Sequence, residues 1–202
     1  MNNTVFVVGL GPGDPQFLTA QAQSALQKAE VLCGYTVYLD LVRPYYPEKE
    51  YYATGMTKEL DRCRWALETA QSGKTVALIC SGDAGVYGMA SPLLELAERF
   101  PDVAVEVVPG LTAALSGGAV LGAPLAHDFC VLSLSDRLTP WAVIQRRQPW
   151  AISASRCTTP PPRVGRTTLK KRSASCWNTA NRPRPSAAWC GTSGGRARPT
   201  AS

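Results

Sequence analysis

The chain has 202 residues, and 45% of them are hydrophobic, which is enough to build a globular core. No apolar run is long enough to span a bilayer and the first residues lead directly into a strand pattern, so we expect a cytoplasmic protein without membrane association. Seven scattered cysteines form no close Cys-x-x-Cys pair, which argues against a zinc site or a redox dithiol. We therefore expect no metal.

The net charge of +6 comes from one end of the chain. All 15 acidic residues lie within residues 1–150, whereas residues 151–202 contain ten basic residues and no acid. A basic protein often has a nucleic-acid partner. Here, however, the excess of positive charge belongs to the tail alone, and the remainder of the chain is acidic.

Residues 1–135 alternate β-branched runs with helical patterns. Strands are expected near residues 4–8, 31–33, 75–80, 103–108 and 129–134, and helices near 19–29, 57–72, 85–100 and 111–121. This alternation predicts a parallel α/β sheet.

Two of these helices have clear apolar stripes. Helix 57–72 is expected to begin at a capping Thr57. Its stripe and that of helix 85–100 are predicted to pack in the core, through Leu60, Cys63, Leu67 and Ala70 in the first, and Met89, Leu93, Leu96 and Phe100 in the second.

An aromatic segment separates the second strand from Thr57. It reads GYTVYLDLVRPYYPEKEYYATGM and contains six tyrosines. These rings could pack over the sheet edge, which is the commoner behaviour of aromatic side chains, or cover a flat ligand. The sequence leaves both possibilities open.

The first strand leads into the glycine-rich turn GLGPGDP, which runs from Gly9 to Pro15. Open α/β sheets bind ligands at the carboxyl ends of their strands, where this turn lies. The turn does not match the dinucleotide fingerprint, because Pro12 and Asp14 stand where the helix should begin. Asp14 could act in a site or simply stabilise its own turn.

Two further glycine-rich segments follow the third and fourth strands. SGDAGVYGMA covers residues 81–90, with Asp83 at the turn and Tyr87 beyond it. VPGLTAALSGGAVLGAPLAHDF covers residues 108–129 and offers little side-chain bulk near Gly110. Three such loops at one sheet edge predict a binding cleft.

The three motifs, in this order and spacing, resemble the tetrapyrrole (precorrin) methyltransferase family. The segments TGMTKELDRCRWALETAQSGKTVALICSGDAGVYGMA and LSLSDRLTPWAVI are similar to its precorrin-3B C(17) branch, and the resemblance covers residues 3–146. It implies a two-domain α/β fold, usually a homodimer, that uses S-adenosylmethionine to methylate precorrin-3B, with ring contraction, in cobalamin biosynthesis. Other members of the family, such as uroporphyrinogen methylases, are the alternatives within the fold.

The resemblance also implies positions for the site. Contacts to the cofactor fall on Gly82, Asp83, Val86, Tyr87, Leu111, Thr112 and Ala113. The substrate side falls on Gly11, Pro12, Gly13 and Asp14. Because a sulfonium methyl group is already activated, the protein mainly has to align it and exclude water.

Ring contraction calls for proton transfers. Asp14, Asp83 and His127, the only histidine, are the candidate catalytic residues. His127 lies in PLAHDF at the start of an expected strand, where a structural, hydrogen-bonded histidine is the commoner case.

The tail loses all periodicity, and prolines interrupt it repeatedly. We expect residues 147–202 to form a basic disordered extension in place of the second domain. Shifting the codons by two bases lets residues 156–160 encode Leu-Tyr-Asn-Pro and residues 186–195 encode Cys-Gly-Val-Val-Arg-Asn-Ile-Gly-Arg, two motifs that the resemblance implies for that domain. Trp189 followed by Cys190 can give only Val in that frame.

We hypothesise a frame shift near residue 147 that impairs activity. The alternative from another functional class is a non-catalytic RNA-binding protein.

Overall fold

The computed structural model describes residues 3–126, 129–133, 139–147, 155–156 and 190–191. The chain divides into two units, residues 1–113 and 114–202, and each is described by itself. The first unit contains the glycine-rich segments 9–15 and 81–90, and the third segment as far as Ala113.

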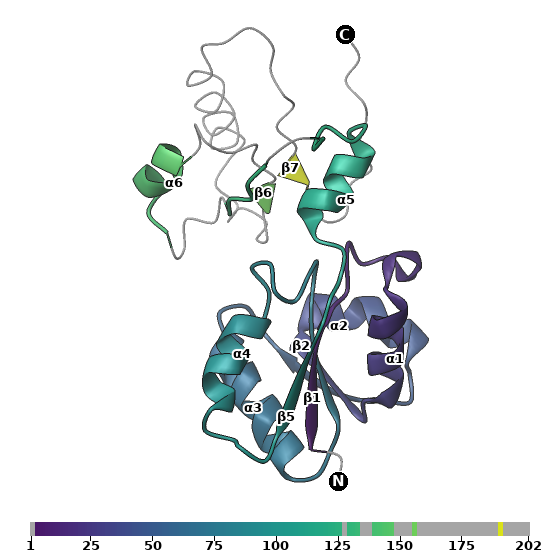
Figure 1. The fold of residues 1–202 in the computed structure, drawn as a ribbon. Coiled ribbons are helices and arrows are strands. Elements are labelled where there is room, and N and C mark those ends of the chain that lie inside the picture. Colours follow the sequence, from purple (N-terminus) through teal and green to yellow (C-terminus); the bar gives the residue numbers. More distant parts are fainter. Residues whose placement is uncertain (1–2, 127–128, 134–138, 148–154, 157–189, 192–202) are drawn as a thin grey trace, which may run out of the picture. The chain divides into compact units, whose positions relative to one another are not determined.

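The first unit is built on a five-stranded parallel sheet (Figure 1). Its strands stand in the order β3-β2-β4-β1-β5, with all neighbouring pairs parallel. The strands are β1 (Thr4–Gly9), β2 (Val31–Tyr35), β3 (Glu50–Thr54), β4 (Val76–Cys80) and β5 (Ala104–Val108). The predicted parallel α/β sheet is confirmed.

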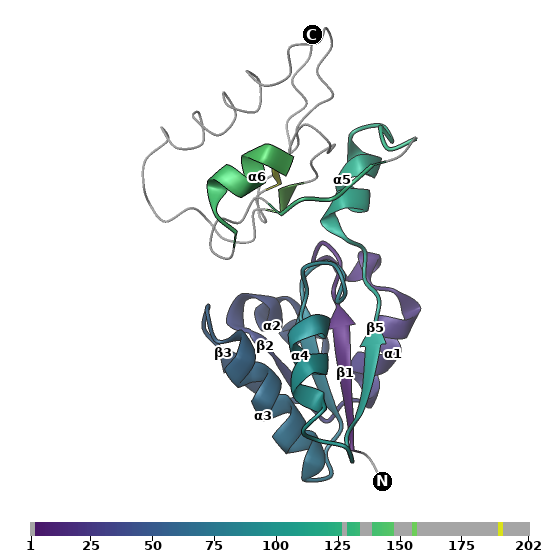
Figure 2. The same cartoon turned by 60° about the vertical axis from the view of Figure 1, so that its left-hand side comes forward.

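Helices cover both faces of this sheet (Figures 1 and 2). One face carries α1 (Ala20–Lys28) and α2 (Thr36–Val42), and the other carries α3 (Glu59–Gln71) and α4 (Ala90–Ala97). Two short 3-10 turns, η1 (Pro15–Phe17) and η2 (Arg43–Tyr45), complete the connections. Parallel strands need crossover connections of this kind, and the helices bury both faces of the three central strands β1, β2 and β4.

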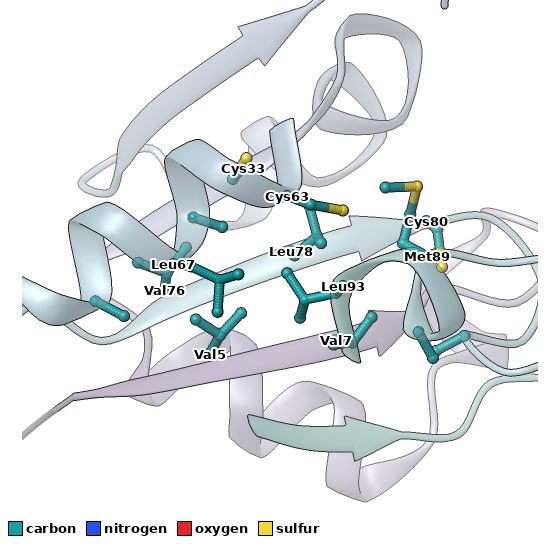
Figure 3. Packing of buried hydrophobic residues seen from close by; sticks show 14 of the residues in the cluster. Val5, Val7, Cys33, Cys63, Leu67, Val76, Leu78, Cys80, Met89 and Leu93 are labelled. Carbon is teal, nitrogen blue, oxygen red and sulfur yellow. The ribbon is translucent and has the colours of Figure 1, made fainter. Parts of the chain in front are cut away.

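The alternation of side chains along β1 shows how the two cores arise. Val5 and Val7 point to the α3 and α4 side, where Figure 3 shows them packed with Leu67, Leu78 and Leu93. The intervening side chains of β1 belong to the second core, under α1 and α2. Successive side chains of a strand face opposite sides of the sheet, so β1 contributes side chains to both cores.

The second unit contains most of α5 (Ala113–Val120), together with α6 (Trp141–Arg147). Two short strands, β6 (Ser155–Arg156) and β7 (Cys190–Gly191), pair in parallel. The rest of the expected extension 147–202 lies outside the described residues, and so does His127.

Two expectations about helix starts were wrong. Thr57 does not cap α3: it has φ 67, the helix follows Lys58, and Leu60 is 57% exposed. Helix 85–100 begins only at Ala90, because residues 85–89 form the loop after β4. The buried stripe of α3 contains Arg62 instead of Leu60.

One α-helix and one strand of the first unit were missed, and one strand was wrongly expected. The aromatic segment contains both α2 and β3, which the tyrosine pattern concealed. Residues 129–133 form no strand, and Phe129 and Cys130 are exposed there without a pairing strand among the described residues. In the part of the chain with described coordinates, no helix has the length and apolar character needed to cross a membrane.

Candidate functional site

The carboxyl ends of β1, β4 and β5 meet at one edge of the sheet, as the glycine-rich loops predicted. A Cβ built on Gly9 would lie 2.6 Å from the Gly82 carbonyl oxygen and 2.9 Å from the Gly110 nitrogen. A Cβ on Gly110 would collide with the carbonyl groups of Gly82 and Gly9. Only glycine allows the three backbone segments to come this close, so packing of the loops requires glycine at positions 9 and 110.

The β1 loop, residues 10–14, is joined directly to the β4 loop, residues 81–89. Gly11 and Gly82 form an isolated antiparallel bridge, in which Gly11 N donates to Gly82 O at 3.0 Å and Gly82 N donates to Gly11 O at 2.8 Å. Both glycines have positive φ, 65 and 69, a conformation that other residues rarely adopt. Residues expected to face the substrate and the cofactor therefore share one backbone junction.

Asp83 ties the β4 loop to the β5 loop, residues 109–112. Its Oδ1 accepts a hydrogen bond from Gly85 N at 2.8 Å, and its Oδ2 accepts one from Gly110 N at 2.9 Å. A carboxylate that receives two backbone N–H groups is well suited to fix loop geometry. The structure thus gives Asp83 a positioning role that the sequence did not reveal.

Asp14 and Thr19 cap the two short elements after β1. Asp14 is exposed, and its Oδ1 accepts from Gln16 N at 3.0 Å, which caps η1. Thr19 accepts from Ala22 N at 3.0 Å, capping α1, and its hydroxyl donates to Pro109 O at 3.2 Å. Thr19 was not singled out as a site residue, although a threonine before a helix is a capping signal.

The residues expected to contact the cofactor border the same junction. The Cα of Thr112 would lie 3.9 Å from a Cβ built on Gly82, and the Cβ of Leu111 would lie 3.6 Å from one on Gly11. Gly82 and Thr112, which the resemblance assigns to one cofactor site, therefore lie close together. Tyr87 is 54% exposed at φ 55. Val86 lies beside it in the β4 loop, and Ala113 begins α5.

Most of the tyrosines pack against protein. Tyr52 stacks on Trp65 with ring centroids 3.8 Å apart, and the guanidinium of Arg43 lies 4.5 Å from the centre of the Tyr51 ring. Burial is the main cause that raises the pKa of Tyr51. Tyr45 is the exception, because it is 59% exposed. The interpretation that these rings pack against protein therefore holds for most of the six tyrosines.

A cavity of about 180 Å³ opens beside the β1 loop. Gly13 lines it from that loop and Pro15 from η1, while Leu41, Tyr45 and Tyr46 line it from α2 and the turn that follows. A cavity of about 150 Å³ accommodates benzene, so this one is large enough for a single aromatic ring. In the described part of the chain, no three His, Cys, Asp or Glu side chains gather as metal ligands.

The sequence profile of tetrapyrrole (corrin/porphyrin) methylases matches residues 4–165. The chain belongs to this family. It is 51% identical over 142 residues to a Salmonella typhimurium protein named as a probable cobalt-factor III C(17)-methyltransferase, covering 70% of this chain and 59% of that relative. The match to the methylase profile continues beyond residue 146, where we expected the first domain to end.

Solved structures of tetrapyrrole methylases have the same fold. The methyltransferase CobJ matches with a TM-score of 0.66 and 39% identity, over 71% of this chain and 61% of that one. A uroporphyrin-III C-methyltransferase from Thermus thermophilus, complexed with S-adenosylhomocysteine, matches with a TM-score of 0.52 and 32% identity, over 64% and 58% of the two chains. The chain therefore spans about three-fifths of the length of these proteins.

Proposed function

We propose that this chain carries the methyl-donor half of a tetrapyrrole methyltransferase of cobalamin biosynthesis. The substrate is cobalt-factor III or precorrin-3B, methylated at C17. The glycine junction formed by the β1, β4 and β5 loops supports this proposal most strongly, because it gathers three loops at the carboxyl edge of the sheet, where open α/β sheets bind ligands. The 51% identity to a cobalt-factor III methyltransferase supports the choice of substrate.

The junction suits S-adenosylmethionine. Gly82 has open space on the side where a Cβ would stand, with only the Cα of Thr112 within 4 Å. Asp83, Val86, Tyr87, Leu111 and Ala113 lie in the same loops. A related methylase that was crystallised with S-adenosylhomocysteine supports the same assignment.

When bound, the cofactor supplies a sulfonium methyl group that a nucleophilic ring carbon attacks; the new C–C bond forms as the C–S bond breaks, leaving neutral S-adenosylhomocysteine. The protein needs no covalent nucleophile for this step. Its loops align the two reactants and exclude water, and such alignment is sensitive to displacements of about 1 Å. We assign that alignment to the backbone junction and to the carboxylate of Asp83 that holds it.

On the tetrapyrrole side, Gly11, Pro12, Gly13 and Asp14 are the proposed contacts. The cavity beside Gly13 is large enough for one pyrrole ring or its side chain. Asp14 is exposed and can exchange a proton with a bound substrate during ring contraction, and His127 is the other candidate for that role. Asp83 stays among the candidates, although both of its oxygens already accept hydrogen bonds.

We also propose that residues from about 147 onward are a frame-shifted reading of the family's second domain. The ten bases, the absence of acids and the repeated prolines of residues 151–202 support this. A cofactor enclosed by two domains loses about half of its contacts when one domain is read in the wrong frame. The chain with the present sequence should therefore methylate its substrate poorly. The intact enzyme would be a cytoplasmic homodimer without a nucleic-acid or membrane partner.

Transfer of labelled methyl from S-adenosylmethionine tests the function. We would assay the chain with the present sequence, and a chain with its frame restored near residue 147, with cobalt-factor III, precorrin-3B and uroporphyrinogen. We expect transfer to one of the first two substrates by the restored chain, and little by the chain with the present sequence. Preference for uroporphyrinogen would place the chain in another branch. Tight, steeply salt-dependent RNA binding without any methyl transfer would favour an RNA-binding protein.

A further inference from the structure

Arg62, on α3, is only 3% exposed. Among the residues whose burial is described, it is the one charged side chain that is buried. Its Nε donates to the Thr54 hydroxyl at 2.7 Å, its Nη2 donates to the Gly55 carbonyl at 3.2 Å, and its Nη1 lies 3.9 Å from the Met89 sulfur. These contacts join α3 to two separate loops.

No carboxylate among the described residues forms an ion pair with this guanidinium. Two thiols lie near it, but they do not supply a negative charge. Burial raises the pKa of Cys63 to about 12, and raises that of Cys33 even further, in each case outweighing the attraction of Arg62. The positive charge is therefore balanced only by dipoles, namely a hydroxyl and a carbonyl.

A buried charge of this kind is not explained by stability. Desolvation of an ion is costly, and replacing buried ionic groups by apolar side chains of similar volume is often neutral or stabilising. Retention of a guanidinium is instead explained by its rigid fork of donors, which can hold several acceptors in one geometry.

The groups that Arg62 holds lie at the carboxyl edge of the sheet. Thr54 ends β3, Gly55 begins the turn to α3, and Met89 ends the β4 loop. Two of the three non-glycine residues with positive φ in the described chain stand beside these contacts: Thr57 at φ 67 and Tyr87 at φ 55. Such conformations persist where the surroundings fix them, and they gather at ligand sites.

We propose that Arg62 is a positioning residue that clamps the turn of residues 54–57 and the end of the β4 loop in their ligand-binding shapes. The turn thereby becomes a further wall of the site, two strands away from the glycine junction in the sheet order. The link to methyl transfer rests on the proposed function, because only there does the β4 loop hold the methyl donor.

Hydrogen exchange of the full chain without ligand tests the clamp directly. In Arg62→Met, amides of residues 55–58 should exchange about tenfold faster, as expected when hydrogen bonds to a charged group are lost from a locally opening segment. Amides of residues 85–89 should also exchange faster, by a smaller factor because the Met89 contact is weak. Those of β1 and β4 should be unchanged.

Cys63→Ala is the matched control, because it opens space next to Arg62 on the same helix and leaves all three clamp contacts intact. It should leave exchange in both loops at the wild-type rate. Thr54→Val removes the hydroxyl acceptor alone and should also loosen residues 55–58. If Arg62→Met unfolds the chain, Thr54→Val still decides. Unchanged loop exchange in Thr54→Val, or equal acceleration in Cys63→Ala, would overturn the clamp.

Calorimetry with S-adenosylhomocysteine adds the functional readout. Arg62→Met should bind it about tenfold more weakly than wild type, and Arg62→Lys should fall between them because lysine keeps the charge but not the fork. Equal affinity in wild type and Arg62→Met would contradict the role in positioning. If neither the wild type nor the chain with its frame restored near residue 147 binds S-adenosylhomocysteine, the proposed function fails, while the exchange experiment still tests the clamp.

Discussion

Replacing Asp83 by Asn removes one of the two backbone hydrogen bonds that its carboxylate accepts, of which the one from Gly110 ties the β4 loop to the β5 loop. The Asp83 carboxylate accepts from Gly85 N and Gly110 N at 2.8 and 2.9 Å. An asparagine amide has a single acceptor oxygen, and its NH₂ group would face the second backbone donor. We therefore expect the β4 and β5 loops to separate locally.

The cost follows from the kind of bond that is lost. A hydrogen bond to a charged group contributes about 1.5–3 kcal/mol when buried. Asp83 is only partly buried, so about 1–2 kcal/mol is a better expectation after solvent screening. At about 4 °C per kcal/mol for a unit of this size, Tm should fall by about 4–8 °C.

Thermal unfolding and calorimetry with S-adenosylmethionine measure both consequences. The matched control is Asp102→Asn, which removes the same charge from an exposed residue before β5, at the opposite edge of the sheet. Asp83→Asn should lower Tm and weaken S-adenosylmethionine binding, whereas Asp102→Asn should change neither. If both variants behave alike, the hydrogen bonds to Gly85 and Gly110 do not hold the site.

Further changes test the packing around the junction and in the core under α3. Gly9→Ala places a Cβ 2.6 Å from the Gly82 oxygen and should lower the free energy of unfolding by about 1–3 kcal/mol in chemical denaturation. Gly55→Ala is the control, because nothing lies within 4 Å of its Cβ, and it should leave the free energy of unfolding unchanged. Equal losses of stability in the two variants would contradict the close approach of the loops. Thr19→Ala should lower the free energy of unfolding by about 1 kcal/mol through loss of the α1 cap, and Thr19→Ser should retain it. Because burial raises the pKa of Cys63 from 9.0 to about 12, the unfolded thiol ionises first, so stability should hold below about pH 9 and then fall by about 1.4 kcal/mol per pH unit for this thiol. Cys63→Ala should make that fall shallower, and identical slopes in denaturation between about pH 9 and 10 would refute the assignment.

The sequence was sufficient for the features that depend on local pattern. Alternation in β1 places Val5 and Val7 in one core, and the glycines of three loops identify the sheet edge where those loops meet. β3 escaped detection because it is an edge strand whose tyrosines stay partly exposed. α2 is short, and Val37 is 51% exposed on it, so its periodicity is weak.

Long-range contacts could not be predicted in the same way. Asp83 and Gly110 are 27 residues apart, and no spacing rule indicates that one carboxylate would bind that backbone nitrogen. Likewise, the apolar spacing of α3 favoured Leu60 as a core residue. Arg62 is buried instead, because Thr54 and Gly55 on the neighbouring β3 segment supply acceptors for it.

Titration of the ¹⁵N-labelled chain with S-adenosylhomocysteine tests the location of the methyl-donor site most directly, because NMR detects even weak binding residue by residue. We expect saturable shifts confined to the amides of residues 82–87 and 110–113, with smaller shifts at Gly11 across the bridge to Gly82. Shifts that instead gather around the cavity at Gly13 and Tyr46, or no shifts at any ligand concentration, would contradict the assignment of the β4 and β5 loops to the methyl donor.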